Sequence, residues 1–274
     1  MDTENQFEIP VIMTFAGNDP TGGAGIQADI ESISSMGGHA AAVVTALTIQ
    51  DTQNVLGYMP VDLTTITEQA RAVLEDMPVS AIKIGMVGSV EAVEVIHSIL
   101  MDYPDLPVVF DPILSSGGGE ELADGEIQQA MLSLLAPLTT VITPNSLEAR
   151  ILCSEADNLD ACAHELMDFG CEYVLITGSH ENTEKVVNTF YGNSRVLDEY
   201  TWERLPQTYH GSGCTLSASI AALLAQGIDP LSAVHEAQEF TWQALKNARR
   251  LGMGQYLPNR YFWAQNDIVD EEKS

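Results

Sequence analysis

Positive charge is scarce in this sequence. Its 274 residues include 11 lysines and arginines against 39 aspartates and glutamates, which gives a formal net charge of −28. Proteins that bind nucleic acids contact phosphates through clustered lysines and arginines, so this balance argues against a nucleic-acid partner. A site for an anionic substrate would need a local positive field, from a metal ion, a helix N-terminus and a few basic side chains.

Long apolar runs, targeting signals and paired cysteines are absent as well. No apolar run approaches the roughly 20 residues that span a bilayer, so we expect no membrane partner. Residues 1–5 are polar and acidic, unlike a secretory or transit peptide, and we expect a cytoplasmic protein. The cysteines show neither CxxC pairing nor zinc-ligand spacing, so reduced thiols are expected at Cys153, Cys162, Cys171 and Cys214.

The order of apolar and amphipathic stretches predicts an α/β fold. Short apolar runs alternate with amphipathic segments, and this alternation is typical of βαβ units in a parallel sheet. Strands are predicted at residues 11–15, 40–45, 81–84, 108–110, 141–142 and 173–176, with an edge hairpin at 185–191 and 195–204. Helices are predicted at 25–36, 64–76, 89–101, 125–135, 146–153, 160–169, 213–226 and 231–250.

This order predicts one doubly wound, mostly parallel sheet that is flanked by helices and carries a small edge hairpin. Such sheets bind ligands at the carboxyl ends of their strands. We assign residues 10–264 to the domain, 1–9 to an N-terminal tail and 265–274 to an acidic C-terminal tail.

A glycine turn precedes an Ala- and Leu-rich stretch that is typical of a buried helix. Residues 210–215 are His-Gly-Ser-Gly-Cys-Thr. Glycines let the backbone approach a ligand, and the N–H groups and dipole of a helix N-terminus attract anions. The same field favours the thiolate of Cys214. The segment predicts a phosphate site with a proton acceptor beside it, the alternative being an ordinary loop with a buried cysteine.

Polar groups also follow other predicted strands. Residues 17–29 hold several glycines without the Gly-Lys-[Ser/Thr] of a Walker loop or the G-x-G-x-x-G spacing, so they indicate a ligand loop or a helix-capping turn. Gln50 follows a predicted strand and offers a donor and an acceptor to a ligand, the alternative being a solvated glutamine in a loop. Asp111 and Glu148 follow neighbouring strands and could together hold Mg²⁺, the alternative being acids that stabilise helix N-termini.

Three motifs resemble those of the hydroxymethylpyrimidine and phosphomethylpyrimidine kinases of thiamine biosynthesis, in the ribokinase-like superfamily. His-Gly-Ser-Gly-Cys-Thr-Leu-Ser at 210–217 is similar to their carboxyl-terminal signature, in which Cys stands where most sugar kinases have an Asp base. Gly-Asn-Asp-Pro-Thr-Gly-Gly-Ala-Gly-Ile-Gln-Ala-Asp at 17–29 is similar to their amino-terminal motif. Asn145 and Glu148 match the Asn-x-x-Glu motif, and the matches extend from residue 16 to 219.

The resemblance implies an ATP-dependent kinase that phosphorylates 4-amino-5-hydroxymethyl-2-methylpyrimidine and its monophosphate. It makes Cys214 the catalytic base, with charge stabilised by the N–H groups of Gly211, Ser212 and Gly213. It assigns the pyrimidine to Gly17, Gly23, Asp29, Gln50, Met86 and Ile113. It assigns ATP to Asn145, Thr177, His210, Gly211 and Gly213, and Mg²⁺ to Asp111 and Glu148. It also implies a homodimer.

Some positions depart from the family pattern or leave alternatives open. Many relatives have Lys where this chain has Thr177, Gln207 and the loop at 115–118. Lys83 lies in a Lys-Ile-Gly-Met segment that lines the family's pyrimidine pocket, but it could instead pair with a buried carboxylate. The alternative functions are a pyridoxal or pyridoxine kinase, and a non-catalytic pyrimidine-binding or regulatory protein.

Overall fold

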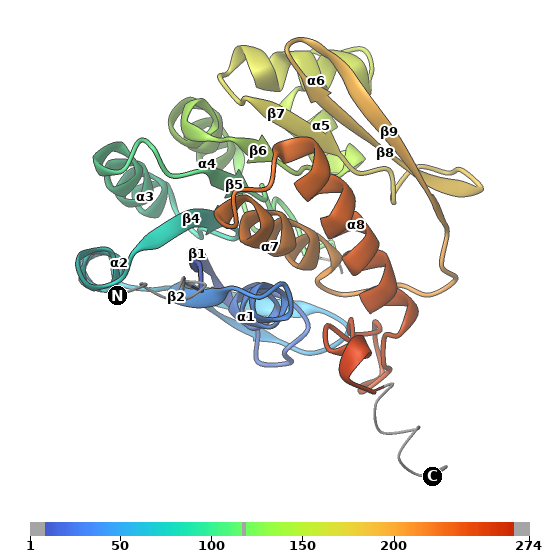
Figure 1. The fold of residues 1–274 in the computed structure, drawn as a ribbon, viewed down its shortest axis with the longest axis horizontal. Helices are drawn as coiled ribbons and strands as arrows, with labels where there is room; N and C mark the ends of the chain where they lie inside the picture. The colour runs from blue at the N-terminus through green and yellow to red at the C-terminus, as the bar shows by residue number, and fades with distance from the viewer. Residues whose placement is uncertain (1–8, 117–118, 266–274) are drawn as a thin grey trace, which may run out of the picture.

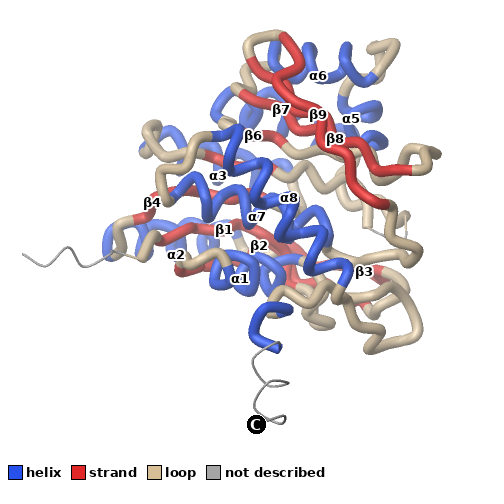
Figure 2. Tube along the Cα trace, turned by 45° about the vertical axis from the view of Figure 1, so that its right-hand side comes forward, coloured by secondary structure: helices blue, strands red, loops and turns tan. Residues whose placement is uncertain are grey.

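One mixed β-sheet runs through the whole molecule. The computed structural model describes residues 9–116 and 119–265, and in this part of the chain nine strands follow the order β3-β2-β1-β4-β5-β6-β7-β8-β9 (Figures 1 and 2). The strands from β2 to β7 in this order are parallel, whereas β3, β8 and β9 pair antiparallel with their neighbours. Their bounds are β1 Val11–Asn18, β2 His39–Gln50, β3 Val55–Pro60, β4 Val79–Ile84, β5 Val108–Phe110, β6 Val141–Ile142, β7 Tyr173–Ile176, β8 Lys185–Gly192 and β9 Arg195–Glu203.

Helices cover both faces of this sheet (Figures 1 and 2). One face packs against α1 Gly25–Ser35, α7 Ser212–Ala225 and α8 Pro230–Lys246, around buried Ile33, Ala218 and Ala237. The other packs against α2 Leu63–Asp76, α3 Val90–Asp102, α4 Gly125–Ala130, α5 Ser146–Leu152 and α6 Leu159–Asp168. The central strands are therefore buried on both faces, as their continuous apolar sequences require. The predicted doubly wound α/β sheet is confirmed.

Helix α7 is buried along most of its length. Residues 214–223 of this helix are all buried, and most of them are Ala, Ser or Leu. The hydroxyls of Ser217 and Ser219 donate to the carbonyls of Gly213 and Thr215, four residues back, so these polar groups are satisfied inside the core. Small side chains let α7 lie close to the sheet, with its N-terminus at the edge where the parallel strands end.

The structure differs from the predicted elements mainly at irregular places. Strand β3 was missed because Gly57 and Pro60 weaken the strand pattern, and it pairs on one side with β2. The helix predicted at 125–135 is α4 followed by a π-helical turn, Met131–Leu135, and a 3₁₀ turn, Ala136–Leu138, where Pro137 cannot continue the α-helical hydrogen bonds. Helix α8 ends at Lys246 rather than 250, and a 3₁₀ turn, Phe262–Gln265, was not predicted.

The hairpin at β8 and β9 is confirmed, and its turn residues Asn193 and Ser194 adopt left-handed φ angles of 52° and 54°. Of the predicted tails, residues 1–8 and 266–274 lie outside the described residues. No helix in the described ranges is both long and apolar enough to cross a membrane.

Candidate active site

A cavity of about 800 Å³ opens where the parallel strands end. The end of β2 and the loops after β1, β4, β5, β6 and β7 contribute to its lining, together with the first turn of α7. All the predicted site residues except Gly23 and Asp29 line it: Gly17, Gln50, Met86, Asp111, Ile113, Asn145, Glu148, Thr177, His210, Gly211, Ser212, Gly213 and Cys214. The topology therefore gathers residues from distant parts of the sequence at one edge of the sheet.

The turn before α7 requires glycine for two reasons. Gly211 is the N-cap of α7 and has a φ of 78°. A Cβ atom on Gly211 would lie 1.9 Å from the carbonyl oxygen of Gly23, which is far too close. No side chain among the described residues caps α7 at this end, so the first N–H groups of the helix face the cavity without an intrachain side-chain partner. The turn can therefore accept an anionic group.

Cys214 lies in the first turn of α7 and is 5% exposed. Burial raises the pKa of the Cys214 thiol to about 12, with Asp111 and Asp29 acting in the same direction and Lys83 against it. The helix N-terminus is expected to favour the thiolate, whereas burial favours the protonated thiol, and the net shift in the pKa of Cys214 is upward.

Asp29 and Lys83 form an ion pair with no exposed side-chain surface. Lys83 Nζ donates to the two carboxylate oxygens of Asp29 at 2.9 and 3.1 Å, and the Thr14 hydroxyl donates to Asp29 Oδ2. Burial alone would lower the pKa of Lys83, but Asp29 and other nearby anionic groups raise it well above its ordinary value. Neither residue lines the cavity. The alternative interpretation of Lys83 is thus the correct one, and Asp29 is not placed where it could meet a ligand directly.

Asp111 and Glu148 are two buried carboxylates at the cavity wall. Asp111 Oδ2 lies 3.2 Å from Ser217 Oγ. Glu148 closes a capping box on α5, since its side chain accepts from the Asn145 N–H while the Asn145 side chain accepts from the Glu148 N–H. The helix-capping role that the sequence left as an alternative is therefore real for Glu148.

The electrostatics of this pair also fit a cation. Burial raises the pKa of Asp111 to about 6, and burial together with the charge of Asp111 raises that of Glu148 to about 8. A bound cation would relieve both shifts. The described residues contain no cluster of three or more His, Cys, Asp or Glu side chains that could hold a metal by itself. Mg²⁺ commonly takes one or two carboxylates and completes its shell with water and substrate phosphates, so the donor set fits.

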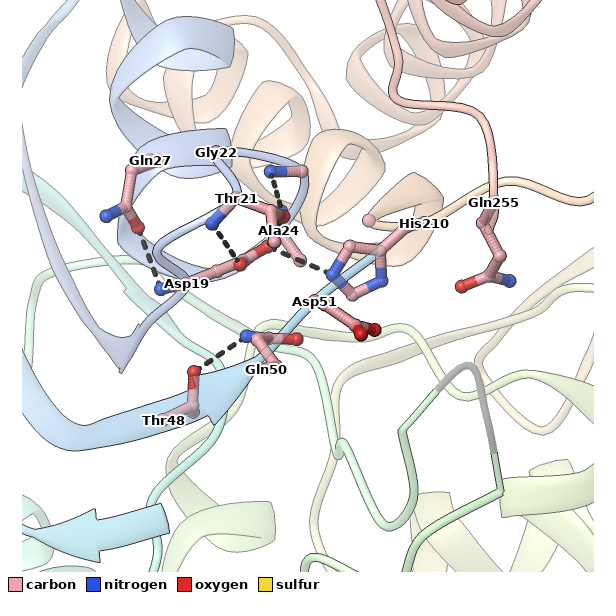
Figure 3. Close-up of polar contacts among 12 residues, drawn as sticks. Asp19, Thr21, Gly22, Ala24, Gln27, Thr48, Gln50, Asp51, His210 and Gln255 are labelled. Carbon is pink, nitrogen blue, oxygen red and sulfur yellow. Dashed lines mark hydrogen bonds and ion pairs between the residues drawn. The ribbon is translucent and has the colours of Figure 1, made fainter. Parts of the chain in front are cut away.

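Asp19 ties the first glycine loop to the turn before α7 (Figure 3). One of its carboxylate oxygens accepts from the Thr21 N–H at 2.8 Å. The other oxygen lies 3.0 Å from the Thr21 hydroxyl, 2.8 Å from the Ala24 N–H and 2.9 Å from His210 Nε2. Burial would raise the pKa of Asp19, but the hydrogen bonds from His210 and Thr21 hold it below its ordinary value. The sequence motif contained Asp19, yet nothing in its spacing indicated a contact with His210.

The orientation of the Gln50 amide follows from its neighbours (Figure 3). The Thr48 hydroxyl donates to the Asn18 carbonyl at 2.7 Å, so its oxygen can only accept from Gln50 Nε2, also at 2.7 Å. Gln50 Oε1 is then left buried without a partner in the described part of the chain. Because buried acceptors are normally satisfied, this oxygen is available to accept from an N–H or O–H group of a ligand or of a water molecule.

An apolar wall stands beside Gln50. Met86 packs with Ala46, Val55 and Leu122, and Ile113 packs against this cluster. A Cβ atom on Gly17 would lie 3.1 Å from Met86 Sδ, so a side chain there would press on this wall. An apolar wall and an unpartnered acceptor in the same cavity suit a small aromatic heterocycle.

The rest of the cavity includes residues that the sequence did not single out. Trp202, Arg204 and Trp242 line it from β9, the segment after it and α8. Arg204 donates to the carbonyls of Ser179, Glu181 and Thr183, and thereby fixes the loop that follows Thr177. These side chains lie outside every motif, and no signal in the sequence pointed to them.

The positions where relatives have Lys can be placed only in part. Thr177 and Gln207 line the cavity, as do Ser115 and Ser116. Residues 117–118 of the same loop lie outside the described residues.

Comparison with known proteins gives the family. A model of the phosphomethylpyrimidine kinase family matches residues 19–259. A hydroxymethylpyrimidine/phosphomethylpyrimidine kinase of Staphylococcus aureus (strain Mu50) is 31% identical over 270 residues, which cover 96% of this chain and 98% of the relative. The thiamine biosynthesis bifunctional protein ThiED of Geobacter sulfurreducens is 34% identical over 264 residues, which cover 94% of this chain and 54% of that protein.

Solved structures of pyridoxal kinases have the same fold as this chain. An ADP complex of Bacillus subtilis pyridoxal kinase has a TM-score of 0.85 and 30% identity, covering 94% of this chain and 100% of the other. Staphylococcus aureus pyridoxal kinase in complex with AMP-PCP and pyridoxal has a TM-score of 0.85 and 26% identity, covering 94% and 96%. The resemblance inferred from the motifs is confirmed, and the chain belongs to the phosphomethylpyrimidine kinase family of phosphotransferases.

Proposed function

We propose that this protein transfers the γ-phosphoryl group of ATP to the hydroxymethyl group of 4-amino-5-hydroxymethyl-2-methylpyrimidine, and then to the resulting monophosphate, in thiamine biosynthesis. The observation that carries the proposal is that one cavity joins three parts: the free acceptor of Gln50, the glycine turn with Cys214, and the carboxylates Asp111 and Glu148. Phosphoryl transfer needs positioning and charge stabilisation more than covalent chemistry, and these parts provide both.

The pyrimidine ring is proposed to lie against Met86 and Ile113, close to the backbone of Gly17. Its exocyclic amine would donate to Gln50 Oε1, the buried acceptor that lacks a partner. Asp29 and Gly23 act from behind the cavity: Asp29 fixes Lys83, and Gly23 packs beneath His210. Gly23 must be glycine there, because a Cβ atom would lie 2.6 Å from the His210 ring.

ATP is proposed to extend from the loop at Asn145 and Thr177 to the turn at His210, Gly211 and Gly213. These residues line one continuous cavity, and the related kinases described above bind ADP or AMP-PCP. Mg²⁺ would be held by Asp111 and Glu148, where it would neutralise phosphate charge. The free N–H groups of Gly211, Ser212 and Gly213 would stabilise the negative charge that develops on the transferred group.

Cys214 is proposed to take the proton of the attacking hydroxyl. To do so it must first be a thiolate, and two features of the chain favour that form: the charge of Lys83 and a hydrogen bond from the Gly25 N–H. Asp111 opposes it. Neutralisation of Asp111 by a cation would therefore bring the pKa of Cys214 down towards the working range.

A turnover assay tests this proposal. Purified protein is incubated with ATP, Mg²⁺ and one of four alcohols: the hydroxymethylpyrimidine, its monophosphate, pyridoxal or pyridoxine. Phosphorylation of both pyrimidines supports the proposal. A preference for the vitamin B6 compounds would support the second candidate, a pyridoxal kinase, which the similarity to the Bacillus subtilis enzyme favours. Pyrimidine binding without turnover would instead identify a binding or regulatory protein.

The remaining assignments are proposals as well. We infer a homodimer, a cytoplasmic location and no nucleic-acid partner, and we keep residues 10–264 as the kinase domain. The charge of −28 supports the absence of a nucleic-acid partner.

A further inference from the structure

Arg260 lies buried behind the two glycine turns of the active site. Its side chain is 1% exposed although it belongs to the irregular segment after α8. Nη2 donates to the Gly23 carbonyl at 2.6 Å, and Nη1 donates to Glu31 Oε2 at 3.1 Å and lies 3.4 Å from the Gly22 carbonyl. Nε donates to the Thr215 hydroxyl at 2.9 Å. One guanidinium group therefore reaches both turns.

The two turns meet at the point that Arg260 touches. The Gly23 carbonyl, which accepts from Arg260, lies so close to Gly211 that a Cβ atom there would be 1.9 Å away. The Thr215 hydroxyl, which accepts from Arg260, donates in turn to the Gly211 carbonyl at 2.8 Å. The guanidinium is thus linked to Gly211 from two sides, and Gly211 is the N-cap that begins α7.

Burial of a guanidinium group costs desolvation free energy, which its hydrogen-bond partners must offset. The identity of these partners therefore indicates the role of Arg260. Its single carboxylate partner in the described chain is Glu31, whose side chain is 38% exposed, so a strong buried ion pair is not the reason for its position. Most of its hydrogen bonds are made to carbonyl and hydroxyl groups of the two loops. Its own backbone is fixed as well, because the Ser35 hydroxyl donates to the Arg260 carbonyl at 2.8 Å.

We propose that Arg260 is a positioning residue that sets the spacing between the loop at residues 19–25 and the turn at residues 210–214. This inference rests on the proposed kinase function. The first N–H groups of α7 must face the transferred phosphoryl group, while the Gly25 N–H must face Cys214, so the relative position of the two turns decides whether both can act together. Arg260 does not touch the cavity and takes no part in the chemistry itself.

The expected kinetic signature follows from this geometry. Gln50 and Met86, which bind the ring in the proposed complex, make no contact with Arg260 among the hydrogen bonds and core contacts of the described residues. Loss of the guanidinium should therefore lower kcat and leave the KM for the pyrimidine within about threefold. A displacement of about 1 Å in a catalytic arrangement can cost roughly 10²-fold in rate, so we expect kcat to fall 10- to 100-fold.

Two variants and one control test the inference. Arg260→Ala leaves a space that free guanidinium ion can enter, and millimolar guanidinium chloride should restore part of kcat, whereas equal concentrations of urea or sodium chloride should not. Arg260→Lys keeps the charge but lacks the fork that reaches both loops, so it should lose most of kcat as well. Arg71→Met removes an exposed arginine that pairs with Asp102 and should behave as the wild type. Thermal unfolding establishes that each variant is folded.

The outcomes are distinguishable. A wild-type protein without turnover on any of the four alcohols contradicts the proposed function itself. An active wild type together with a folded Arg260→Ala variant of unchanged kcat overturns the role of Arg260 alone. Equal losses in kcat and in affinity without rescue by guanidinium also overturn it, because they indicate general damage to the fold. If Arg260→Ala does not fold, the separation of kcat from KM in Arg260→Lys decides the question.

Discussion

At the scale of single residues, Cys214 is subject to opposing influences. Burial raises the pKa of its thiol to about 12, against Lys83 and the Gly25 N–H. Below the pKa of the thiol the thiolate fraction rises tenfold for each pH unit, so kcat/KM should climb as the pH rises above 7 and should level off only near the pKa that Cys214 has once Asp111 is neutralised. Cys214→Asp, which is already ionised, should keep part of the activity and lose this climb. Steady-state kinetics against pH measures both.

Cys214→Ser provides the control for this prediction. It keeps the shape of the side chain but is a much weaker base, and loss of a positioned base typically costs about 10²–10⁴ in rate. Turnover equal to that of the wild type in this variant would mean that Cys214 only packs, and the base would then lie elsewhere in the cavity.

Gln50 allows a separate prediction about the substrate. Its buried Oε1 has no partner in the described structure, so it should accept a hydrogen bond from the pyrimidine amine. Gln50→Leu removes this acceptor and should cost about 1–3 kcal/mol of pyrimidine binding, or about 5- to 150-fold in affinity. Isothermal titration calorimetry measures it, with ATP binding as the internal control. Unchanged pyrimidine affinity would exclude Gln50 from the site.

At the scale of elements, the link between β4 and α1 is the buried pair of Lys83 and Asp29. Removing one partner of such a pair leaves an uncompensated buried charge, which costs about 3–5 kcal/mol. Lys83→Met should therefore lower the free energy of unfolding by about that amount, and the double variant Lys83→Met/Asp29→Leu should recover part of it. Urea unfolding measures each value.

The exposed pair Arg71–Asp102 is the matched control for this prediction. Its side chains are about half exposed, 47% and 52%. Exposed pairs contribute about 0–1 kcal/mol, so Arg71→Met should change stability little. If Lys83→Met also lowers the free energy of unfolding by less than about 1 kcal/mol, the buried pair contributes no more to stability than the exposed one.

The elements also show what a sequence can and cannot reveal. Apolar runs such as those of β5 and β6 were predicted to the residue, because a strand buried on both faces has no other pattern. Motifs identified which residues gather at the cavity, since parallel strands end at one edge. The motifs did not reveal how deeply each side chain is buried. Asp29 was expected at the edge of the bound pyrimidine ring, and it is fully buried. The burial of Asp29 depends on how α1 packs against β4, and these two elements are far apart in the sequence.

The roles of residues outside the motifs could not be predicted from the sequence, because they too depend on tertiary contacts. Arg260 is a lone basic residue in an irregular segment, and its partners Gly23 and Thr215 lie 237 and 45 positions away. Trp202 and Trp242 enter the cavity from β9 and α8, whose mutual position depends on the whole sheet. Such contacts are set by tertiary structure, and no local pattern carries them.

At the scale of the whole molecule, the end of β2 presents polar side chains on one face and exposed apolar side chains on the other. Thr48 and Gln50 line the cavity, while Leu47 and Ile49, which alternate with them along the strand, are 44% and 66% exposed. Met59 of β3 pairs with Leu47 and is 62% exposed, so it extends the same apolar face. Exposed apolar faces of this kind are typical of interfaces, and we expect a second copy of the chain to cover this one in the proposed homodimer.

The net charge of the chain determines the direction in which salt should change the association of the dimer. Two chains that each carry −28 repel one another, so salt should strengthen a dimer held by apolar contacts, because it screens the repulsion. Ile49→Glu should raise the dissociation constant more than about tenfold, since a two-fold interface contains the substitution twice and each 1.4 kcal/mol is tenfold. Val196→Glu, at an exposed apolar position on β9, is the control. Sedimentation velocity at two salt concentrations measures the association. A wild-type monomer, or a dimer unaffected by Ile49→Glu, would mean that this face is not the interface.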